Sequence, residues 1–138
     1  MRALVQRVSR ASVSVDGVAR AAIGPGLLVL LGVTHADNEF ICDRLADKVR
    51  ALRVFADGDG KMNEPLGDRE VLVVSQFTLY GDARRGNRPS YVEAARPEQA
   101  EPLYERFRAR LEAQGGAFGE YMEVDLVNDG PVTLLLEM

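Results

Sequence analysis

The stretch Gly24-Pro25-Gly26-Leu27-Leu28-Val29-Leu30-Leu31 decides which class of fold this chain can form. Glycine and proline interrupt the preceding structure, and five aliphatic residues then follow without polar alternation. A continuous apolar run of this kind is typical of a strand buried on both faces. It is far shorter than the roughly 20 residues that a membrane-spanning helix needs. We therefore expect a central strand of a soluble domain.

A β-hairpin is predicted before this strand. Val13 and Val15 alternate with serines, and Asp16-Gly17 stands directly before Val18. An Asp-Gly pair between alternating apolar residues is a strong hairpin signal, because both turn positions tolerate positive φ. Three further strands are expected at residues 71–79, 121–127 and 132–136.

Two amphipathic helices are expected beside the sheet. The first follows a cap at Asp37 and repeats apolar residues at a period near 3.6, namely Ile41, Leu45, Val49 and Leu52. The second covers residues 97–114, buries Ala100, Leu103, Tyr104, Phe107 and Leu111, and ends at Gly115-Gly116. Pro102 removes a hydrogen bond inside it, so this helix is either kinked there or begins later than Pro97. The pattern predicts one α/β domain over residues 1–138.

Composition narrows the class of protein further. The 138 residues are 46% hydrophobic, which suits a single domain with its own core. The 17 basic and 21 acidic residues give a net charge of −4, which excludes a polybasic protein that holds nucleic acid by charge alone. Charge is polarised, since residues 112–138 contain six acids and no base. The single cysteine excludes an internal disulfide and favours a reducing, cytoplasmic location.

Few side chains suit covalent catalysis or metal binding. His35 is the only histidine, so any Ser-His-Asp or Cys-His system would have to use it, and we expect it in an exposed loop. Cys42 lies on the flank of the first helix and reads as a core thiol. Asp57-Gly58-Asp59-Gly60-Lys61 begins like a calcium loop, but Lys61 occupies the third ligand position. We expect a plain turn there and no metal site.

Two polar segments interrupt the apolar strands. Ser75-Gln76-Phe77-Thr78-Leu79-Tyr80 follows Val71-Leu72-Val73-Val74, and its simplest interpretation is an amphipathic strand end with Ser75, Phe77 and Leu79 on one face. Asn128-Asp129-Gly130-Pro131-Val132-Thr133 is most simply a turn between two strands. Taken alone, each segment is as consistent with a structural role as with a functional one.

Together, however, the two segments resemble the signature motifs of the D-aminoacyl-tRNA deacylase family. The motifs are Ser75-Gln76-Phe77-Thr78-Leu79 and Asn128-x-Gly130-Pro131-x-Thr133, in the family's order. Other stretches are also similar to family positions: residues 1–8, residues 24–29, Gly60-Lys61-Met62-Asn63, Arg88-Pro89-Ser90 and Phe118-Gly119-x-x-Met122. The resemblance covers essentially the whole chain.

The resemblance implies a small barrel-like mixed β-sheet structure flanked by two main helices, assembled as a homodimer without metal or organic cofactor. It implies hydrolysis of the ester that joins a D-amino acid, or glycine on tRNA(Ala), to the terminal adenosine of tRNA. The Gly130-Pro131 bond is expected to be cis and to enter the active site of the other subunit. Its carbonyls would hold the substrate ammonium group and exclude an L side chain.

The same resemblance suggests roles for individual residues. Ser75 and Gln76 would bind the terminal adenosine and ribose, and the N–H groups near Phe77 and Thr78 would stabilise the oxyanion. Thr78 is either a nucleophile or a positioning group, and we favour the second because an aminoacyl ester is already activated. Further candidates are Phe118, Met122, Asn128 and Thr133 for substrate, and Arg84, Arg85 and Arg88 for RNA.

Alternatives and departures stay open at this level. An inactive homodimeric RNA-binding protein of the same fold, or a deacylase dedicated to glycyl-tRNA(Ala), would carry the same motifs. The connections over residues 63–70 and 111–118 are shorter than is usual in the family. Glu120 stands where a small residue is expected.

Overall fold

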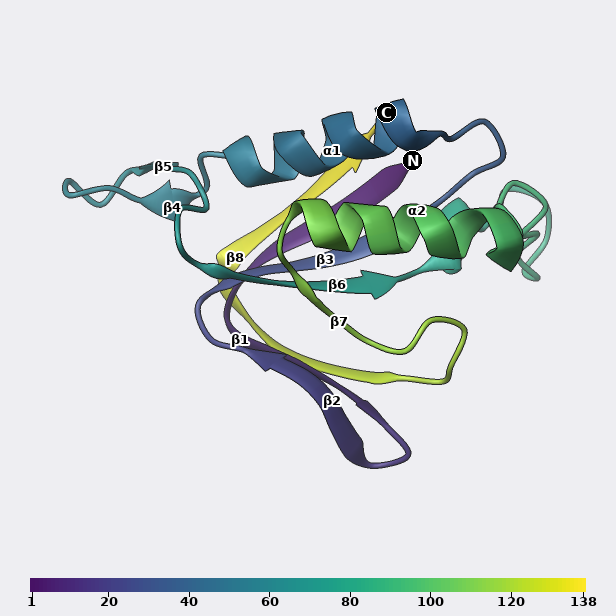
Figure 1. Ribbon diagram of the computed structural model, residues 1–138, viewed down its shortest axis with the longest axis horizontal. Helices are drawn as coiled ribbons and strands as arrows, with labels where there is room; N and C mark the ends of the chain where they lie inside the picture. The colour runs from purple at the N-terminus through teal and green to yellow at the C-terminus, as the bar shows by residue number, and fades with distance from the viewer.

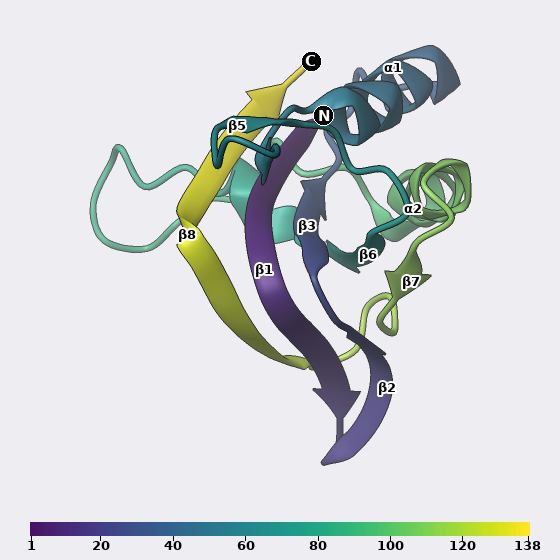
Figure 2. The same cartoon turned by 90° about the vertical axis from the view of Figure 1, so that its left-hand side faces the viewer.

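The computed structural model describes residues 1–138 and consists of one strongly curved, six-stranded mixed sheet with two helices on one side, together with a separate two-stranded sheet of β4 and β5 (Figures 1 and 2). In chain order the elements are β1 (Arg2–Val15), β2 (Val18–Ile23), β3 (Gly26–Gly32), α1 (Glu39–Ala51), β4 (Phe55–Ala56), β5 (Met62–Glu64), β6 (Glu70–Ser75), the 3₁₀ helix η1 (Phe77–Tyr80), α2 (Pro97–Arg110), β7 (Gln114–Gly115) and β8 (Glu123–Glu137). The predicted barrel-like α/β fold with two helices is confirmed. Neither helix has the length and apolar character needed to cross a membrane.

Strand β1 is the central strand of the large sheet. The strand order is β2-β1-β3-β6-β7, and β8 also pairs with β1. On one edge β1 pairs antiparallel with β3 and, farther along, with β2. On its other edge it pairs antiparallel with β8 over nearly its whole length. The links from β3 to β6 and from β6 to β7 are parallel. The hairpin prediction is confirmed, because Asp16 and Gly17 form the β1–β2 turn with φ of 52° and 76°.

The aliphatic run lies in β3, buried between β1 and β6 as expected. Leu27 and Val29 face the core that α1 and α2 cover, whereas Leu28 faces a second cluster. That second cluster includes Val13 of β1 and Leu72 of β6. Two cores therefore lie on opposite faces of β3, which explains why its sequence does not alternate.

The helices differ from expectation at their ends. Asn38, not Asp37, caps α1 by accepting a hydrogen bond from Ile41 N at 3.0 Å. Asp37 is buried instead, with one carboxylate oxygen 2.7 Å from the Met1 ammonium and the other bonded to Thr34 N. The Asp37 carboxylate therefore forms a tertiary ion pair with Met1 and does not cap the helix.

Helix α2 begins at Pro97 and runs through Pro102, so the alternative of a later start is wrong. Pro102 is on the exposed side, where water can satisfy the carbonyl that proline leaves unbonded. The helix ends at Arg110 rather than at residue 114. Gln114 and Gly115 instead form β7, because they add a parallel edge to β6.

Two strand predictions are wrong in their boundaries. Strand β6 ends at Ser75, and the chain turns into η1, so Ser75, Phe77 and Leu79 do not share a strand face. Residues 121–127 and 132–136 are not two strands joined by a turn, since β8 is continuous across them. Within β8 the register shifts: Gln6 pairs with Thr133 but Val8 pairs with Asn128, so residues 129–132 bulge opposite Arg7.

Candidate active site

A cavity of about 430 Å³ opens where β6, η1 and the N-terminus of α2 meet. Its lining residues are Leu31, Val33, Ser75, Gln76, Phe77, Tyr91, Ala94, Ala95, Arg96, Pro97, Ala100, Tyr104, Phe118 and Gly119. The structure thus brings four of the predicted site residues together, namely Ser75, Gln76, Phe77 and Phe118. Most of the wall is apolar, so a bound group would contact mainly apolar side chains.

The polar segment after β6 leaves the strand in a 3₁₀ turn, directly after the last hydrogen bond between β3 and β6. Gln76 N donates to Leu31 O at 2.7 Å, and the chain then closes a 3₁₀ turn in which Leu79 N donates to Gln76 O at 3.2 Å. The turn packs tightly on Gly32, where a Cβ atom would lie 3.1 Å from the Leu79 Cβ and 3.2 Å from Gln76 O. A side chain at residue 32 would therefore push the turn outward.

This turn leaves two backbone donors available. Phe77 and Thr78 are its first residues, and the first N–H that the turn itself uses belongs to Leu79. Their N–H groups lie beside the cavity at successive positions. Paired amide donors of this kind suit a developing oxyanion.

The Thr78 hydroxyl is held by its neighbour. The Gln76 side-chain amide donates a hydrogen bond to Thr78 Oγ1, which leaves the hydroxyl proton free to be donated elsewhere. Thr78 is exposed, and no Asp, Glu or His lines the adjoining cavity. A nucleophilic hydroxyl requires a base to accept its proton, so this geometry favours a positioning role for Thr78.

Aromatic side chains that sequence reasoning missed form the cavity wall. Tyr91 packs edge-on against Phe77 with ring centroids 5.1 Å apart, and Tyr104 lies 5.8 Å from Phe118. The Tyr104 hydroxyl donates to Val73 O at 2.8 Å, and burial raises its pKa. Tyr104 belongs to the predicted apolar stripe of α2, which does not indicate a place in the cavity wall. Tyr91 directly follows Arg88-Pro89-Ser90, one of the stretches that are similar to the family.

The two rival nucleophiles do not line the cavity. His35 is exposed, as expected, and its Nε2 lies 2.6 Å from Val92 O. Cys42 is buried beneath α2, where its thiol donates to Leu103 O, and burial raises its pKa to about 11. The expectation of a core thiol is confirmed.

The Gly130–Pro131 bond is cis and lies in the bulge of β8. Asn128 shapes this bulge, since its side-chain oxygen accepts from Val132 N at 3.0 Å and its nitrogen donates to Thr133 Oγ1 at 2.9 Å. The bulge is exposed, and none of its residues lines the cavity of the same chain. Figure 2 shows β8 and α2 on opposite sides of the molecule. Met122 also lies outside the cavity and packs against the second core cluster.

Comparison with known proteins identifies the family. The family model for D-Tyr-tRNA(Tyr) deacylase matches residues 4–137. The chain belongs to that family. A D-aminoacyl-tRNA deacylase of Symbiobacterium thermophilum is 58% identical, with 99% of this chain and 95% of the relative covered. One of Thermotoga petrophila is 56% identical, with 99% and 97% covered. The resemblance stated from the sequence is therefore confirmed.

Solved structures agree with this deacylase fold. A protein described as c-Myc DNA Unwinding Element Binding Protein is 42% identical and superposes with a TM-score of 0.94, covering 100% of this chain and 99% of its own. A "probable eukaryotic D-amino acid tRNA deacylase" superposes with a TM-score of 0.85, covering 99% and 98%, at 14% identity. At that identity the second likeness concerns the fold alone.

The predicted arginine cluster of this deacylase-family chain lies on a separate loop. Asp82 and Ser90 exchange two backbone hydrogen bonds of 2.8 Å at its base, and Arg84, Arg85 and Arg88 surround an open hollow of about 520 Å³. Two hydrogen bonds from the Arg84 guanidinium hold the pKa of Asp82 near 2. Arg85 and Arg88 form no ion pair, so two of the three charges remain free.

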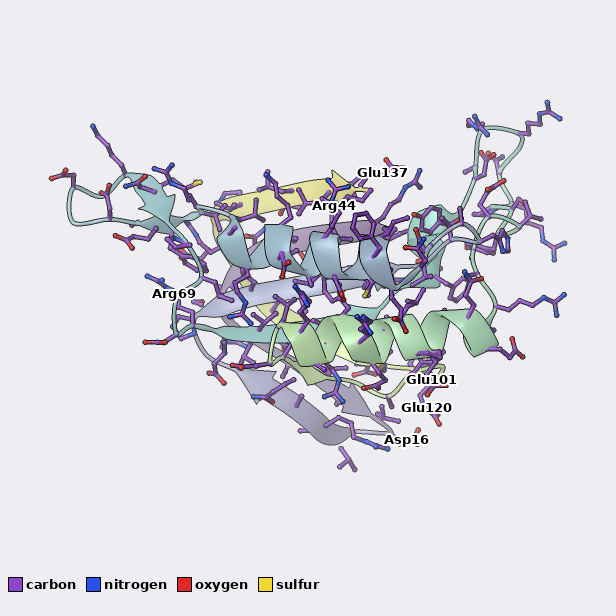
Figure 3. The ribbon with its side chains drawn as sticks, turned by 45° about the horizontal axis from the view of Figure 1, so that its top comes forward. Asp16, Arg44, Arg69, Glu101, Glu120 and Glu137 are labelled. Carbon is purple, nitrogen blue, oxygen red and sulfur yellow. The ribbon has the colours of Figure 1, made fainter.

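Glu120, which stands where the family has a small residue, does not disturb the site. Glu120 is exposed in the turn before β8 and projects away from the body of the molecule (Figure 3). It does not line the cavity, although Phe118 and Gly119 do. A charged side chain there is solvated and leaves the site's shape unchanged.

Proposed function

We propose that this protein hydrolyses the ester bond between a D-amino acid and the terminal adenosine of tRNA. The observation that carries the proposal is the turn after β6, which presents two successive backbone N–H groups and the Thr78 hydroxyl at the edge of the largely apolar cavity that Phe77 lines. Membership of the deacylase family supplies the class of substrate. We place this activity in the cytoplasm, where tRNA is charged.

Orientation and electrostatics supply the catalysis in this proposal. Ser75 and Gln76 bind the terminal ribose and adenine, while the N–H groups of Phe77 and Thr78 receive the negative charge that develops on the carbonyl oxygen of the ester. The Thr78 hydroxyl donates a further hydrogen bond. A water molecule, activated by the neighbouring ribose hydroxyl of the substrate, attacks the carbonyl carbon; the bond from that carbon to the ribose oxygen then breaks, and the proton lost by the water passes to the ribose oxygen. An aminoacyl ester is already activated, so positioning and oxyanion stabilisation can provide the required several kcal/mol.

Selection of D-amino acids requires a second subunit in this proposal. Gly130 and Pro131 lie away from their own cavity, and we propose that they enter the cavity of a partner. Their carbonyls would accept hydrogen bonds from the substrate ammonium group and close the space that an L side chain needs. Glycine has no side chain to exclude, so glycyl-tRNA(Ala) would also be hydrolysed. Phe118 would form part of the pocket wall, whereas Met122, which packs against the second core cluster, would not.

The edge of β8 supports a homodimer. The strand pairs only with β1, so its other edge is open along 15 residues. Val127, Leu134 and Leu135 are exposed beside the Gly130–Pro131 bulge. A long unpaired edge with exposed aliphatic residues favours association. A partner bound there would receive the bulge.

The loop arginines are our candidates for contact with the tRNA phosphates. Arg85 and Arg88 have no internal partner, and arginine forms bidentate contacts with phosphate. The affinity for tRNA should then fall steeply with salt. If neutralising Arg84, Arg85 and Arg88 leaves that salt dependence unchanged, the RNA surface lies elsewhere.

The deciding experiment measures release of labelled D-tyrosine, L-tyrosine and glycine from charged tRNA by the purified protein. We expect rapid release of D-tyrosine and glycine and no release of L-tyrosine above the spontaneous rate. Equal rates for the two enantiomers would exclude chiral proofreading. Binding of tRNA without any release would favour the inactive RNA-binding alternative, and release of glycine alone would indicate a dedicated glycyl-tRNA deacylase.

A further inference from the structure

Arg96 is the only charged residue among those that line the cavity. It precedes Pro97 as the N-cap residue of α2, and its backbone carbonyl accepts hydrogen bonds from Gln99 N and Ala100 N. The backbone of this residue is therefore fixed at the rim. Its guanidinium forms no hydrogen bond or ion pair within the chain, unlike the guanidinium groups of Arg106 and Arg110 farther along the same helix.

No other charged side chain lines the cavity beside the Arg96 guanidinium. The other cavity residues are aliphatic, aromatic, small or neutral polar, and none carries a carboxylate. An unpaired guanidinium beside an apolar wall attracts an anionic group on whatever enters, and it repels a cationic one. The cavity is therefore electrostatically asymmetric, with its positive end at the start of α2 and its backbone donors at η1.

The proposed substrate has a matching asymmetry. Its aminoacyl end carries an ammonium group, and its nucleoside end carries the phosphate that joins the terminal adenosine to the rest of the RNA. Arg96 would repel the first and bind the second. The charges thus favour one orientation, in which the ester lies at Phe77 and Thr78 and the RNA chain leaves past Pro97.

We infer that Arg96 is a substrate-binding residue that holds the phosphate on the 5′ side of the terminal adenosine and so orients the ester toward η1. The inference rests on the proposed function, because it assumes a nucleotide ester as the occupant. In this inference Arg96 contacts the phosphate that lies nearest to the ester, and the arginine loop over residues 81–90 contacts other phosphates. No bond is made or broken by Arg96, so its contribution is to binding.

Two small substrates isolate this contact: the D-tyrosyl ester of adenosine and the D-tyrosyl ester of adenosine 5′-monophosphate, both esterified on the ribose 3′ oxygen. They differ only in the phosphate. We expect the wild-type protein to have a KM about tenfold lower for the phosphorylated ester, with a similar kcat for both. Arg96→Ala should raise the KM for that ester about tenfold and leave the adenosine ester unchanged. Arg96→Lys should restore part of the preference, since lysine keeps the charge.

The matched control is Arg20→Ala, which removes an exposed arginine of β2 that does not line the cavity and should keep the full preference. A merely structural role for Arg96 would change the KM of both esters alike, and that result would overturn the inference. So would an Arg96→Ala protein that still prefers the phosphorylated ester.

Failure of the proposed function has a different signature, since the wild-type protein would then hydrolyse neither ester. In that case calorimetric titration with adenosine 5′-monophosphate and with adenosine tests Arg96 directly. A preference for the nucleotide that Arg96→Ala abolishes would support the inference, and equal binding of the two probes by the wild-type protein would refute it.

Discussion

The Arg7 Nε atom donates a hydrogen bond of 3.0 Å to the backbone carbonyl of Asp129, the residue directly before the Gly130–Pro131 bond. The same guanidinium donates to Val54 O at 2.6 Å and lies 3.4 Å from the Asp129 carboxylate. Arg7 is the β1 residue that faces the bulge of β8. One side chain thus connects the bulge to the segment that follows α1.

We predict that Arg7→Ala impairs the release of D-tyrosine and also destabilises the fold. Loss of the hydrogen bonds to Asp129 and Val54 should release residues 129–131, lower D-tyrosine release at least tenfold and reduce the free energy of unfolding by about 1–3 kcal/mol. Release assays and urea denaturation would measure both effects. Arg10→Ala is the control, because the Arg10–Asp125 pair on the same two strands is largely exposed and exposed pairs contribute little. Equal losses in both variants would contradict the role given to Arg7.

Thr78→Ala should slow hydrolysis without abolishing it. Gln76 holds the Thr78 hydroxyl, and the cavity offers no base to deprotonate it. Loss of a hydrogen-bond donor at the transition state should lower kcat about 100- to 1,000-fold, whereas loss of a nucleophile would lower it about 10⁶-fold. Single-turnover kinetics on D-tyrosyl-tRNA would decide between the two, with Thr78→Ser as the control that keeps the hydroxyl. An unchanged rate in Thr78→Ala would remove this residue from the mechanism.

Ion pairs between the two helices should make stability depend on pH in the acid range. Arg106 donates to Asp43 and Arg110 donates to Asp47, each at 2.7 Å, which holds the pKa of both carboxyl groups below their usual value. Their folded-state pKa values are depressed, so the stabilisation is present above about pH 4 and is lost as pH falls further.

The test compares melting temperatures between pH 6 and pH 2. The double variant Asp43→Asn with Asp47→Asn should melt lower than wild type at pH 6 and lose less of its stability on acidification. Asp68→Asn, at an exposed carboxyl without an ion pair, should follow the wild-type curve. Parallel acid profiles for the wild-type protein and the double variant would show that other carboxyl groups dominate.

Cys42 should resist alkylation in the folded protein. Burial raises its pKa to about 11, and its thiol is bonded to Leu103 O beneath α2. At pH 8 only about one molecule in a thousand would carry a thiolate. Iodoacetamide should leave the intact mass and the activity unchanged, while one carbamidomethyl group should appear after unfolding in guanidinium chloride. Rapid modification of the native protein would show that the thiol is accessible.

Leu135→Glu should separate the proposed dimer. Leu135 is 56% exposed on β8, so a charge there costs the monomer little but opposes burial in an interface. We expect a shift from dimer to monomer in analytical ultracentrifugation, together with at least a tenfold loss of D-tyrosine release. Val18→Glu places the same charge at an apolar residue of β2 with 63% exposure and should change neither. A monomeric wild-type protein that retains full activity would overturn the shared-site proposal.

Local sequence rules predicted much of the framework. Asp16-Gly17 forms the hairpin because its two residues supply the positive φ angles themselves, and Leu27 to Leu31 form a buried strand because an aliphatic run without polar alternation suits a strand that is covered on both faces. The paired motifs around Thr78 and Pro131 also identified the family before any geometry was known. These features depend on residues adjacent in the chain, which is why the pattern alone predicted them.

Other features depend on contacts that a linear pattern does not contain. Residues 75–80 alternate like a strand, yet β6 ends at Ser75, because β3 ends at Gly32 and the chain then closes a 3₁₀ turn with hydrogen bonds from Leu79 N to Gln76 O and from Gly81 N to Thr78 O. Asn128-x-Gly130-Pro131 has the composition of a turn, yet pairing with β1 on both sides keeps β8 continuous. Tyr91 and Arg96 reach the cavity from a segment that lies outside the two signature motifs.

The sequence by itself determined the class of fold, the family and the motif residues 75–79, since those follow from hydrophobic patterning and short motifs. Only the tertiary structure decided that this turn faces an apolar cavity whose single charged residue is Arg96, and that Gly130 and Pro131 lie outside it. The physical reason is that both facts depend on long-range pairing, of β3 with β6 and of β1 with β8. Such pairing brings together groups that are far apart in the chain.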